Sequence, residues 1–470
     1  MEAEIFSWGA AEEVTGSKHF LEIGEDIIMV DCGAFQGHRE EADEKNRNWQ
    51  FDPAALSALI LTHAHYDHSG LIPLLPEKGF NKNIYTTPAS RDLANLIMMD
   101  AAHIQVKDLE YLQKKALKKG IPFEKEPLYT ENEVVESLKL FVTVSYHRPF
   151  IIADGIEVRF YDAGHILGSA ITFLEVKRNS KSLRIGFSGD LGRKNLPILR
   201  DPELLPPVDY LIMESTYGDR LHDPIEKASQ KLAEIVRRTV ERRGKIIIPA
   251  FAVERTQELV YILHLLNDDG KIPKIPVYVD SPMAANATAI FRVHQECYDE
   301  EVRKAFIDHH KNPFGFNELT YVMSTEDSKR LNDLKEPAII ISASGMCESG
   351  RILHHLANNI ENPRNTILIV GFMAQNTLGR RIAEKQPEVK IFGDIYKLKA
   401  EVIVMDTFSA HADQNDILNY ISGLDQRRLK EIFLVHGEPE AQSYLKNLLD
   451  ERGYKTHIMK YGRRYRLNSK

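Results

Sequence analysis

The sequence predicts an α/β protein, and the order of its apolar segments supports this fold class. From Ile5 to about Leu205, short β-like runs alternate with turns and are then joined by helices. After Pro206 and Pro207 the order becomes strand, helix, strand, helix, and each strand is a short continuous apolar run. Such runs between helices are typical of a parallel sheet covered on both faces. The 470 residues suffice for two or three domains with sizeable cores.

The first region combines strands with a few helices. Short runs rich in β-branched and aromatic residues predict strands over 18–23, 27–31, 59–62, 142–145, 156–161, 170–176 and 183–187. One helix is expected to begin at 71–75, and two others are expected to span 88–120 and 131–140. A polar loop over 177–182 joins the last two strands as a hairpin.

The second region alternates strands and helices. Strands are expected over 210–213, 245–249, 276–279, 338–341 and 366–370, and helices over 225–243, 254–266, 282–297, 350–359 and 377–385. No Gly-x-Gly-x-x-Gly turn follows the first of these strands, so a dinucleotide-binding domain has little support. The tail adds strands over 401–405 and 431–435 and a helix over 441–451.

Composition excludes several classes of protein. A formal net charge of −8, from 60 basic and 68 acidic residues, argues against a polybasic nucleic-acid binder, so a phosphate-rich ligand must meet a local basic or metal-charged cleft. Only Cys32, Cys297 and Cys347 occur, which predicts neither a disulfide framework nor a cysteine zinc site. The acidic N-terminus and the lack of a long apolar run predict a cytoplasmic protein without membrane partners.

The densest cluster of metal-binding residue types lies in the stretch Thr62-His63-Ala64-His65-Tyr66-Asp67-His68, directly after an apolar run. Imidazole and carboxylate groups suit zinc and its divalent neighbours, and a cluster this dense can bind two ions. The alternative is a chance or decayed motif.

Other polar residues also follow apolar runs, where a rigid sheet can hold metal ligands in place. They are Asp31, Asp190, Glu214 and His436, while His165 lies between two glycines that let the backbone approach a site closely. Each alone is more often a cap or a turn residue. Their occurrence together with the dense motif makes them candidate site residues.

These residues belong to stretches that resemble the metallo-β-lactamase superfamily and, within it, the β-CASP nucleases. The similarity is strongest to compact bacterial and archaeal relatives of the endonuclease subunit of the cleavage and polyadenylation machinery. It runs through residues 9–17, 31–33, 63–68, 164–165, 188–190, 214–218, 342–346, 408–413 and 435–437.

The resemblance implies a metallo-β-lactamase αββα sandwich with an inserted α/β β-CASP domain, whose parallel sheet is Rossmann-like. The sandwich would comprise residues 1–207 and 396–470, and the β-CASP domain residues 208–395. The implied cofactors are two zinc ions per chain, with manganese as the alternative metal. Two divalent ions that share one carboxylate can acidify a water for attack on phosphorus.

The resemblance also assigns roles. The metal ligands would be His63, His65 and His165 at one ion, Asp67, His68 and His436 at the other, and Asp190 at both, with Asp31 orienting the ligand loop. The catalytic residues would be Asp67, Glu214 and His411, with His411 as general acid held protonated by Glu214. A further metal ligand or a turn residue is the alternative for His411.

The resemblance further places the phosphate contacts of RNA at Ser342, Ser344, Gly345 and Met346, a small-residue turn between a strand and a helix. Such turns are common in α/β domains, so the residues alone leave a structural role equally open. Arg255 and Arg351 are candidate backbone contacts, and each could instead be a salt-bridge partner.

The expected function is zinc-dependent hydrolysis of phosphodiester bonds in single-stranded RNA, as an endonuclease, a 5′-exonuclease or both, in RNA processing or decay. His436 favours RNA, because DNA-processing relatives tend to carry an aliphatic residue there. The rivals are a small-molecule metallohydrolase of the lactamase or glyoxalase type, a DNA-directed β-CASP nuclease and a silent scaffold. A homodimer is the expected assembly only by general frequency.

Overall fold

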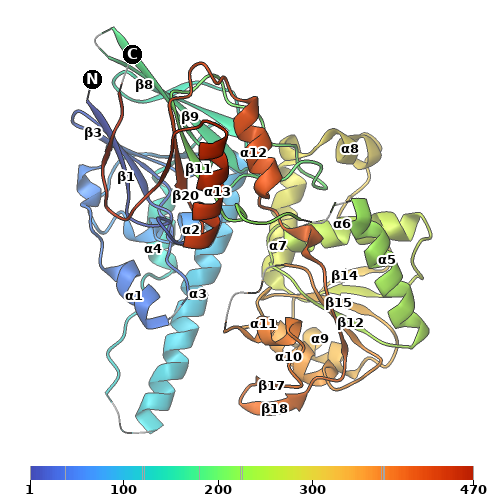
Figure 1. The fold of residues 1–470 in the computed structure, drawn as a ribbon. Helices are drawn as coiled ribbons and strands as arrows, with labels where there is room; N and C mark the ends of the chain where they lie inside the picture. Colours follow the sequence, from blue (N-terminus) through green and yellow to red (C-terminus); the bar gives the residue numbers. More distant parts are fainter. Residues whose placement is uncertain are drawn as a thin grey trace. The chain divides into compact units, whose positions relative to one another are not determined.

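The chain forms two compact units in a computed structural model, which describes residues 2–37, 39–118, 120, 122–178, 180–222, 224, 226–371, 373 and 376–468 (Figure 1). Unit 1 contains Met1–Lys194, Asp201–Leu221 and His411–Lys470, and unit 2 contains Asn195–Arg200 and His222–Ala410. Residues 119, 179 and 225, which fall within the helices and the hairpin loop expected from the sequence, lie outside the described residues.

Unit 1 is built on two seven-stranded sheets. The first has the order β22-β1-β2-β3-β4-β5-β6, with bounds Tyr465–Arg466, Ala3–Ser7, His19–Ile23, Asp26–Val30, Ala58–Ile60, Ile84–Thr86 and Phe141–Thr143. The second has the order β21-β20-β11-β10-β9-β8-β7, with bounds Thr456–Ile458, Glu431–Val435, Tyr210–Glu214, Lys181–Phe187, Ala170–Arg178, Ile156–Asp162 and Phe150–Ala153.

The two sheets share one apolar core. Strand β8 alternates buried and half-buried residues, which is the period of two that a strand with one core face requires. Its Val158 and Phe160 join Ile28 and Val30 of the first sheet in a single cluster of buried side chains. The architecture is therefore a sandwich of two sheets.

Helices cover the outer side of the second sheet. The helices of unit 1 are α1 (Arg39–Arg47), α2 (Tyr66–Ser69), α3 (Pro88–Lys118), α4 (Glu131–Leu138), α12 (Gln414–Gly423) and α13 (Pro439–Glu451). On β11, Leu211 and Met213 point away from the inner core and pack with Ile417 of α12 and Leu445 of α13. Asp413 begins α12 with a capping box, which satisfies free N–H groups of its first turn.

Unit 2 contains a six-stranded sheet in which every neighbouring pair is parallel. Its order is β14-β13-β15-β12-β16-β19, with bounds Leu319–Tyr321, Val277–Val279, Ile339–Ser342, Ile246–Pro249, Thr366–Ile369 and Glu401–Val404. A separate hairpin pairs β17 (Glu388–Ile391) with β18 (Asp394–Lys397).

The helices of unit 2 are α5 (Glu226–Glu241), α6 (Arg255–Asp268), α7 (Pro282–Val293), α8 (Glu300–Val302), α9 (Thr325–Arg330), α10 (Arg351–Asn359) and α11 (Leu378–Ala383). Ile352 of α10 and Ile382 of α11 pack in one cluster with Ile247, Ile340 and Ile367 of the sheet. The continuous apolar strands are thus covered by helices, as the sequence predicts. Within the described residues, no helix combines the length and apolarity needed to cross a membrane.

Three expectations about individual elements are wrong. The strand expected over 210–213 lies in the second sheet of unit 1, where β11 pairs in parallel with β10 and β20, and not in the sheet of unit 2. The strand over 401–405 pairs with β16 in unit 2, and not within the tail. The helix expected from 71–75 is a 3-10 turn at Ile72–Leu74, because a short helix, α2, has already formed inside the histidine motif. The α/β fold class itself is confirmed.

Candidate active site

Five candidate residues lie at the carboxyl ends of strands. Asp31 follows β3, His63 follows β4, Asp190 follows β10, Glu214 ends β11 and His436 follows β20. Strands β3 and β4 are parallel, and so are β10, β11 and β20. Parallel strands bring their carboxyl ends to one edge of a sheet, so polar residues far apart in the chain meet there.

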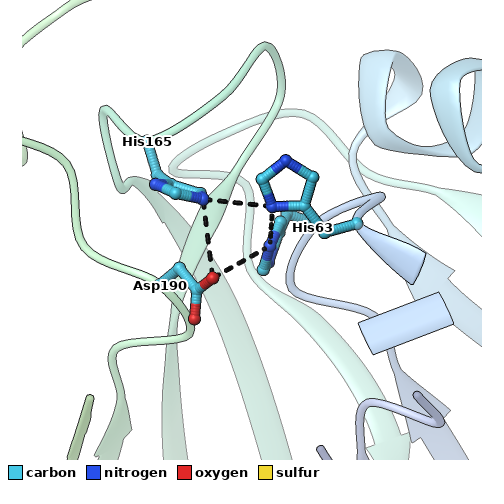
Figure 2. Close-up of side chains that lie close together, drawn as sticks. His63, His165 and Asp190 are labelled. Atoms are coloured by element: carbon cyan, nitrogen blue, oxygen red, sulfur yellow. Dashed lines mark hydrogen bonds and ion pairs between the residues drawn. The ribbon is translucent and has the colours of Figure 1, made fainter. Parts of the chain in front are cut away.

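The first group of candidate ligands consists of His63, His65, His165 and Asp190. Nδ1 of His65 lies 3.1 Å from Nε2 of His63 and 3.2 Å from Nε2 of His165. Oδ2 of Asp190 lies 3.4 Å from His63 Nε2 and 3.5 Å from His165 Nε2, and Figure 2 shows these atoms converging. Ligands about 2.0–2.1 Å from a tetrahedral zinc ion are about 3.3–3.4 Å apart, so these separations fit one ion.

The second group consists of Asp67, His68 and His436, with Asp190 beside it. Nε2 of His436 lies 3.4 Å from Oδ2 of Asp67. The other carboxylate oxygen of Asp190, Oδ1, lies 3.3 Å from His68 Nε2 and 3.5 Å from His436 Nδ1. Each oxygen of Asp190 therefore faces a different group of ligands.

The protonation states of the first group fit metal binding. Burial, followed by the charge of neighbouring histidines, lowers the pKa of His65 to about 3 and that of His165 well below its ordinary value. Burial also lowers the pKa of His63. Neutral imidazoles have the free lone pair that a metal needs. Oδ1 of Asp190 and Nδ1 of His165 are buried without a hydrogen-bond partner among the described residues, which is costly unless another group satisfies them.

Asp31 orients His68. Its Oδ2 lies 2.7 Å from His68 Nδ1 and accepts a hydrogen bond from Thr62 Oγ1, and its Oδ1 accepts one from the Thr62 N–H. Burial lowers the pKa of His68, but the carboxylates of Asp190 and Asp31 outweigh it and raise the pKa well above its ordinary value. Asp31 and His436 both adopt positive φ angles, 64° and 51°, a strain that is often found at functional sites.

His411 lies next to Glu214. Nδ1 of His411 is 3.3 Å from Oε1 of Glu214 and 3.9 Å from Oδ2 of Asp190. Burial lowers the pKa of His411, but the charges of Glu214 and Asp190 raise it to about 9. Glu214 is fully buried, and its Oε1 also accepts a hydrogen bond from the Leu191 N–H.

Thr216 is a site residue to which sequence reasoning gave no role. Its hydroxyl donates to Oε2 of Glu214 at 2.6 Å and lies 3.0 Å from Nδ1 of His436. It thereby links the Glu214–His411 pair to the second group of ligands. The only signal in the sequence was its place two residues after Glu214, inside a stretch that carries the family resemblance.

A buried lysine supports the histidine motif from behind. Lys18 donates hydrogen bonds to the carbonyl oxygens of Gly33 at 2.5 Å and Gly16 at 3.1 Å. The loops that it joins contact the motif directly, because the Ser17 N–H donates to the carbonyl of Asp67. A Cβ on Gly33 would lie 1.5 Å from that same carbonyl, so the close approach requires glycine here.

We expect the substitution Lys18→Met to remove a pH dependence of stability. Burial lowers the pKa of Lys18 to about 8 from an unfolded value of about 10.5, so between these pH values the unfolded chain binds more protons. The unfolding free energy of the wild type should therefore rise through this window, by at most about 3 kcal/mol, and that of the variant should lack this rise. Urea unfolding at pH 7 and pH 10, with chelator present throughout, measures the difference. An equal change in unfolding free energy between pH 7 and pH 10 for the wild type and the variant would contradict the expectation.

The candidate phosphate contacts all lie in unit 2. Ser342 is buried and its hydroxyl donates to the backbone carbonyl of Asp280, while Ser344 Oγ accepts from the Glu348 N–H. Gly345 is buried and Met346 half-buried. The turn thus exists between β15 and α10, with the Ser342 hydroxyl already used inside the protein.

The two candidate arginines have protein partners. Arg255 is buried and forms an ion pair with Glu258. Arg351 forms an ion pair with Asp280 at 2.7 Å and donates to the carbonyls of Val322 and Met323. Their assignment to RNA stays a prediction, and these pairs would have to loosen for it to hold.

Comparison with known proteins assigns the family. Residues 16–250, half of the chain, match the metallo-β-lactamase superfamily. The chain belongs to this superfamily. Residues 256–382 match the β-CASP domain, and residues 395–459 match the Zn-dependent metallo-hydrolase RNA specificity domain. The protein is thus a β-CASP metallo-β-lactamase, a metal-dependent hydrolase with a metal cofactor, as the sequence predicts.

Relatives support this assignment over most of the chain. It is 36% identical to Ribonuclease TTHA0252 from Thermus thermophilus, over 97% of this chain and 98% of that protein. It is 33% identical to Transcription termination factor FttA from Methanosarcina mazei, over 93% of this chain and 67% of that protein. A crystal structure of a protein of unknown function from Enterococcus faecalis has the same fold, with a TM-score of 0.56, 14% identity and coverage of 99% and 100% of the two chains.

Proposed function

We propose that this β-CASP protein is a ribonuclease that hydrolyses phosphodiester bonds of single-stranded RNA, with two zinc ions per chain. The observation that carries the proposal is the position of one carboxylate, Asp190, between two groups of ligands, with the His411–Glu214 pair beside it. The name of a relative, Ribonuclease TTHA0252, and the RNA specificity domain matched at residues 395–459 favour RNA over DNA.

In this proposal each residue at the site has a defined role. His63, His65 and His165 would hold one zinc ion, Asp67, His68 and His436 would hold the other, and Asp190 would serve both. Asp31 fixes the ring of His68. When bound, the ions offset the charge of the phosphate and acidify the attacking water. Manganese is the alternative metal.

His411 supplies the proton that the departing ribose oxygen needs. A histidine can do so only if it is protonated at neutral pH, and the raised pKa of about 9 meets that requirement. Glu214 stabilises the imidazolium, and the hydrogen bonds that Glu214 accepts from Thr216 and Leu191 keep its carboxylate in place. Cleavage can be endonucleolytic, 5′-exonucleolytic or both, and the ends of the products distinguish these modes.

The domain division expected from the sequence, a sandwich of residues 1–207 and 396–470 with a β-CASP domain of 208–395, remains part of the proposal. The homodimer and the cytoplasmic location stay predictions. The turn at residues 342–346 is proposed to contact phosphate through its backbone N–H groups, since the hydroxyl of Ser342 already donates to Asp280.

A substrate panel tests the proposal. We expect the purified protein to cleave labelled single-stranded RNA and to leave duplex DNA and a thioester intact, and we expect a chelator to abolish cleavage. Gel electrophoresis of the labelled products and thiol release from the thioester are the measurements. Turnover of the thioester with intact RNA would instead identify a small-molecule metallohydrolase, and cleavage of DNA alone a DNA-directed nuclease.

A further inference from the structure

Unit 2 contains a pocket that no comparison or assignment above explains. Its volume is about 280 Å³, and its lining includes Arg292, Tyr298, Ile307, Lys311 and Pro313. Small-molecule sites begin at about 300 Å³, so the space lies just below the lower end of that range. The metal-ligand candidates all belong to unit 1, so this pocket is a separate feature.

The wall of the pocket is held in place by its own hydrogen bonds. Arg292, at the end of α7, donates to the carbonyl of Phe314, and Nδ1 of His264 on α6 lies 3.0 Å from the carbonyl of Pro313. The hydroxyl of Tyr298 donates to the carbonyl of Phe291. These contacts fix both sides of the pocket before any ligand arrives, which reduces the ordering cost of binding.

The pocket combines an apolar floor with a basic rim. Tyr298 and Pro313 are buried and Ile307 is half-buried, whereas Arg292 and Lys311 are exposed. Neither Arg292 nor Lys311 has a carboxylate partner among the described residues. A ligand with a negative charge and a flat apolar part fits this arrangement.

Three acidic side chains that are near in sequence pair with other basic groups. Asp308 pairs with Arg303, Glu300 with Lys304, and Glu296 with His294. The two basic groups on the rim therefore keep their charge available, in a chain whose net charge of −8 otherwise repels polyanions.

We infer that this pocket binds one nucleotide of single-stranded RNA, with the phosphate at Arg292 and Lys311 and the base against Tyr298, Ile307 and Pro313. The inference rests on the proposed function, because it names a second contact for the same substrate. A free nucleotide carries the same phosphate and base, and the experiment below distinguishes a free nucleotide from a nucleotide within RNA. Such a contact would add affinity for long RNA without taking part in the chemical step.

The test compares RNA binding by two double variants of the zinc-loaded protein. Both also carry His411→Ala, so that the RNA is not cleaved during the measurement. The pocket variant is Arg292→Ala with Lys311→Ala, and the matched control is Lys274→Ala with Lys335→Ala, two exposed lysines of unit 2 that do not line the pocket. Lys311→Ala alone serves as a second variant, because its side chain makes no hydrogen bond or ion pair in the described structure and its loss should not affect folding.

We expect fluorescence anisotropy with a 20-nucleotide RNA to show about tenfold weaker binding for the pocket variant than for the control. The slope of log affinity against log salt should become shallower by about 0.7, since the contact to one phosphate is lost. In a pocket variant that retains His411, hydrolysis of a small phosphodiester such as bis(p-nitrophenyl) phosphate should proceed at the wild-type rate.

Equal RNA affinity for pocket and control variants would overturn the inference. So would calorimetric binding of adenosine monophosphate that depends on Lys311 while RNA binding does not, because the ligand would then be a free nucleotide. Failure of the wild type to cleave RNA or the small phosphodiester would instead refute the proposed function, and a difference in RNA affinity between the variants would still support the pocket.

Discussion

The substitution His411→Ala should leave two metal ions bound per chain while RNA cleavage falls by about 10²- to 10⁴-fold, the usual contribution of a general acid. Nδ1 of His411 lies closest to Glu214, at 3.3 Å, and 3.9 Å from Asp190, outside the distances among the two groups of ligands. Under the proposed function, its loss removes a proton donor and leaves those ligands in place. Elemental analysis and single-turnover cleavage of a defined RNA give the two readouts.

A matched control for this variant is His354→Ala, which removes an exposed histidine of unit 2 and should alter neither readout. Loss of one metal ion in His411→Ala would show that His411 is a ligand. Cleavage at the wild-type rate with full metal content would show that another group protonates the leaving oxygen.

Asp190→Ala should remove both metal ions and with them all measurable cleavage. The two carboxylate oxygens of Asp190 face different ligand groups, with Oδ2 near His63 and Oδ1 near His68, so neither group is complete without it. Metal content per chain is measured by elemental analysis after dialysis, and circular dichroism verifies that the variant is folded.

Asp67→Ala provides the comparison, because Asp67 belongs to the second group alone. It should lose one ion where Asp190→Ala loses two. Equal metal contents in the two variants would contradict the assignment of Asp190 to both groups, and an unchanged content in Asp67→Ala would remove Asp67 from the ligands.

The positions of the candidate ligands could be predicted because they follow from local pattern. A polar residue directly after a buried apolar run marks the end of a strand, and this rule selected Asp31, Asp190, Glu214 and His436. Their convergence depended on parallel pairing of β10, β11 and β20. That pairing is not local, and the strand at 210–213 was accordingly assigned to the wrong sheet.

Side-chain partners were much harder to predict than positions. The sequence left Arg351 as either a phosphate contact or a salt-bridge partner, and it did not name Asp280, the buried aspartate directly after β13 that accepts its hydrogen bond. The same aspartate binds His355 at 2.6 Å. Residue type and spacing show where a charge lies along an element, and only the packed structure shows which opposite charge already faces it.

The order of the strands has a consequence for synthesis on the ribosome. Strands β11 and β20 pair although they lie far apart in the chain. Their pairing brings the hydroxyl of Thr216 next to the ring of His436, which comes 220 residues later. A nascent chain that already contains His63, His65 and Asp67 still lacks His411 and His436, which follow the last strand of unit 2 in the sequence. Under the proposed function, a polypeptide that ends before His411 has neither a complete second ligand group nor the proton donor. The messenger RNA from which the protein is being translated is then not cleaved by its own product before His411 and His436 have been added.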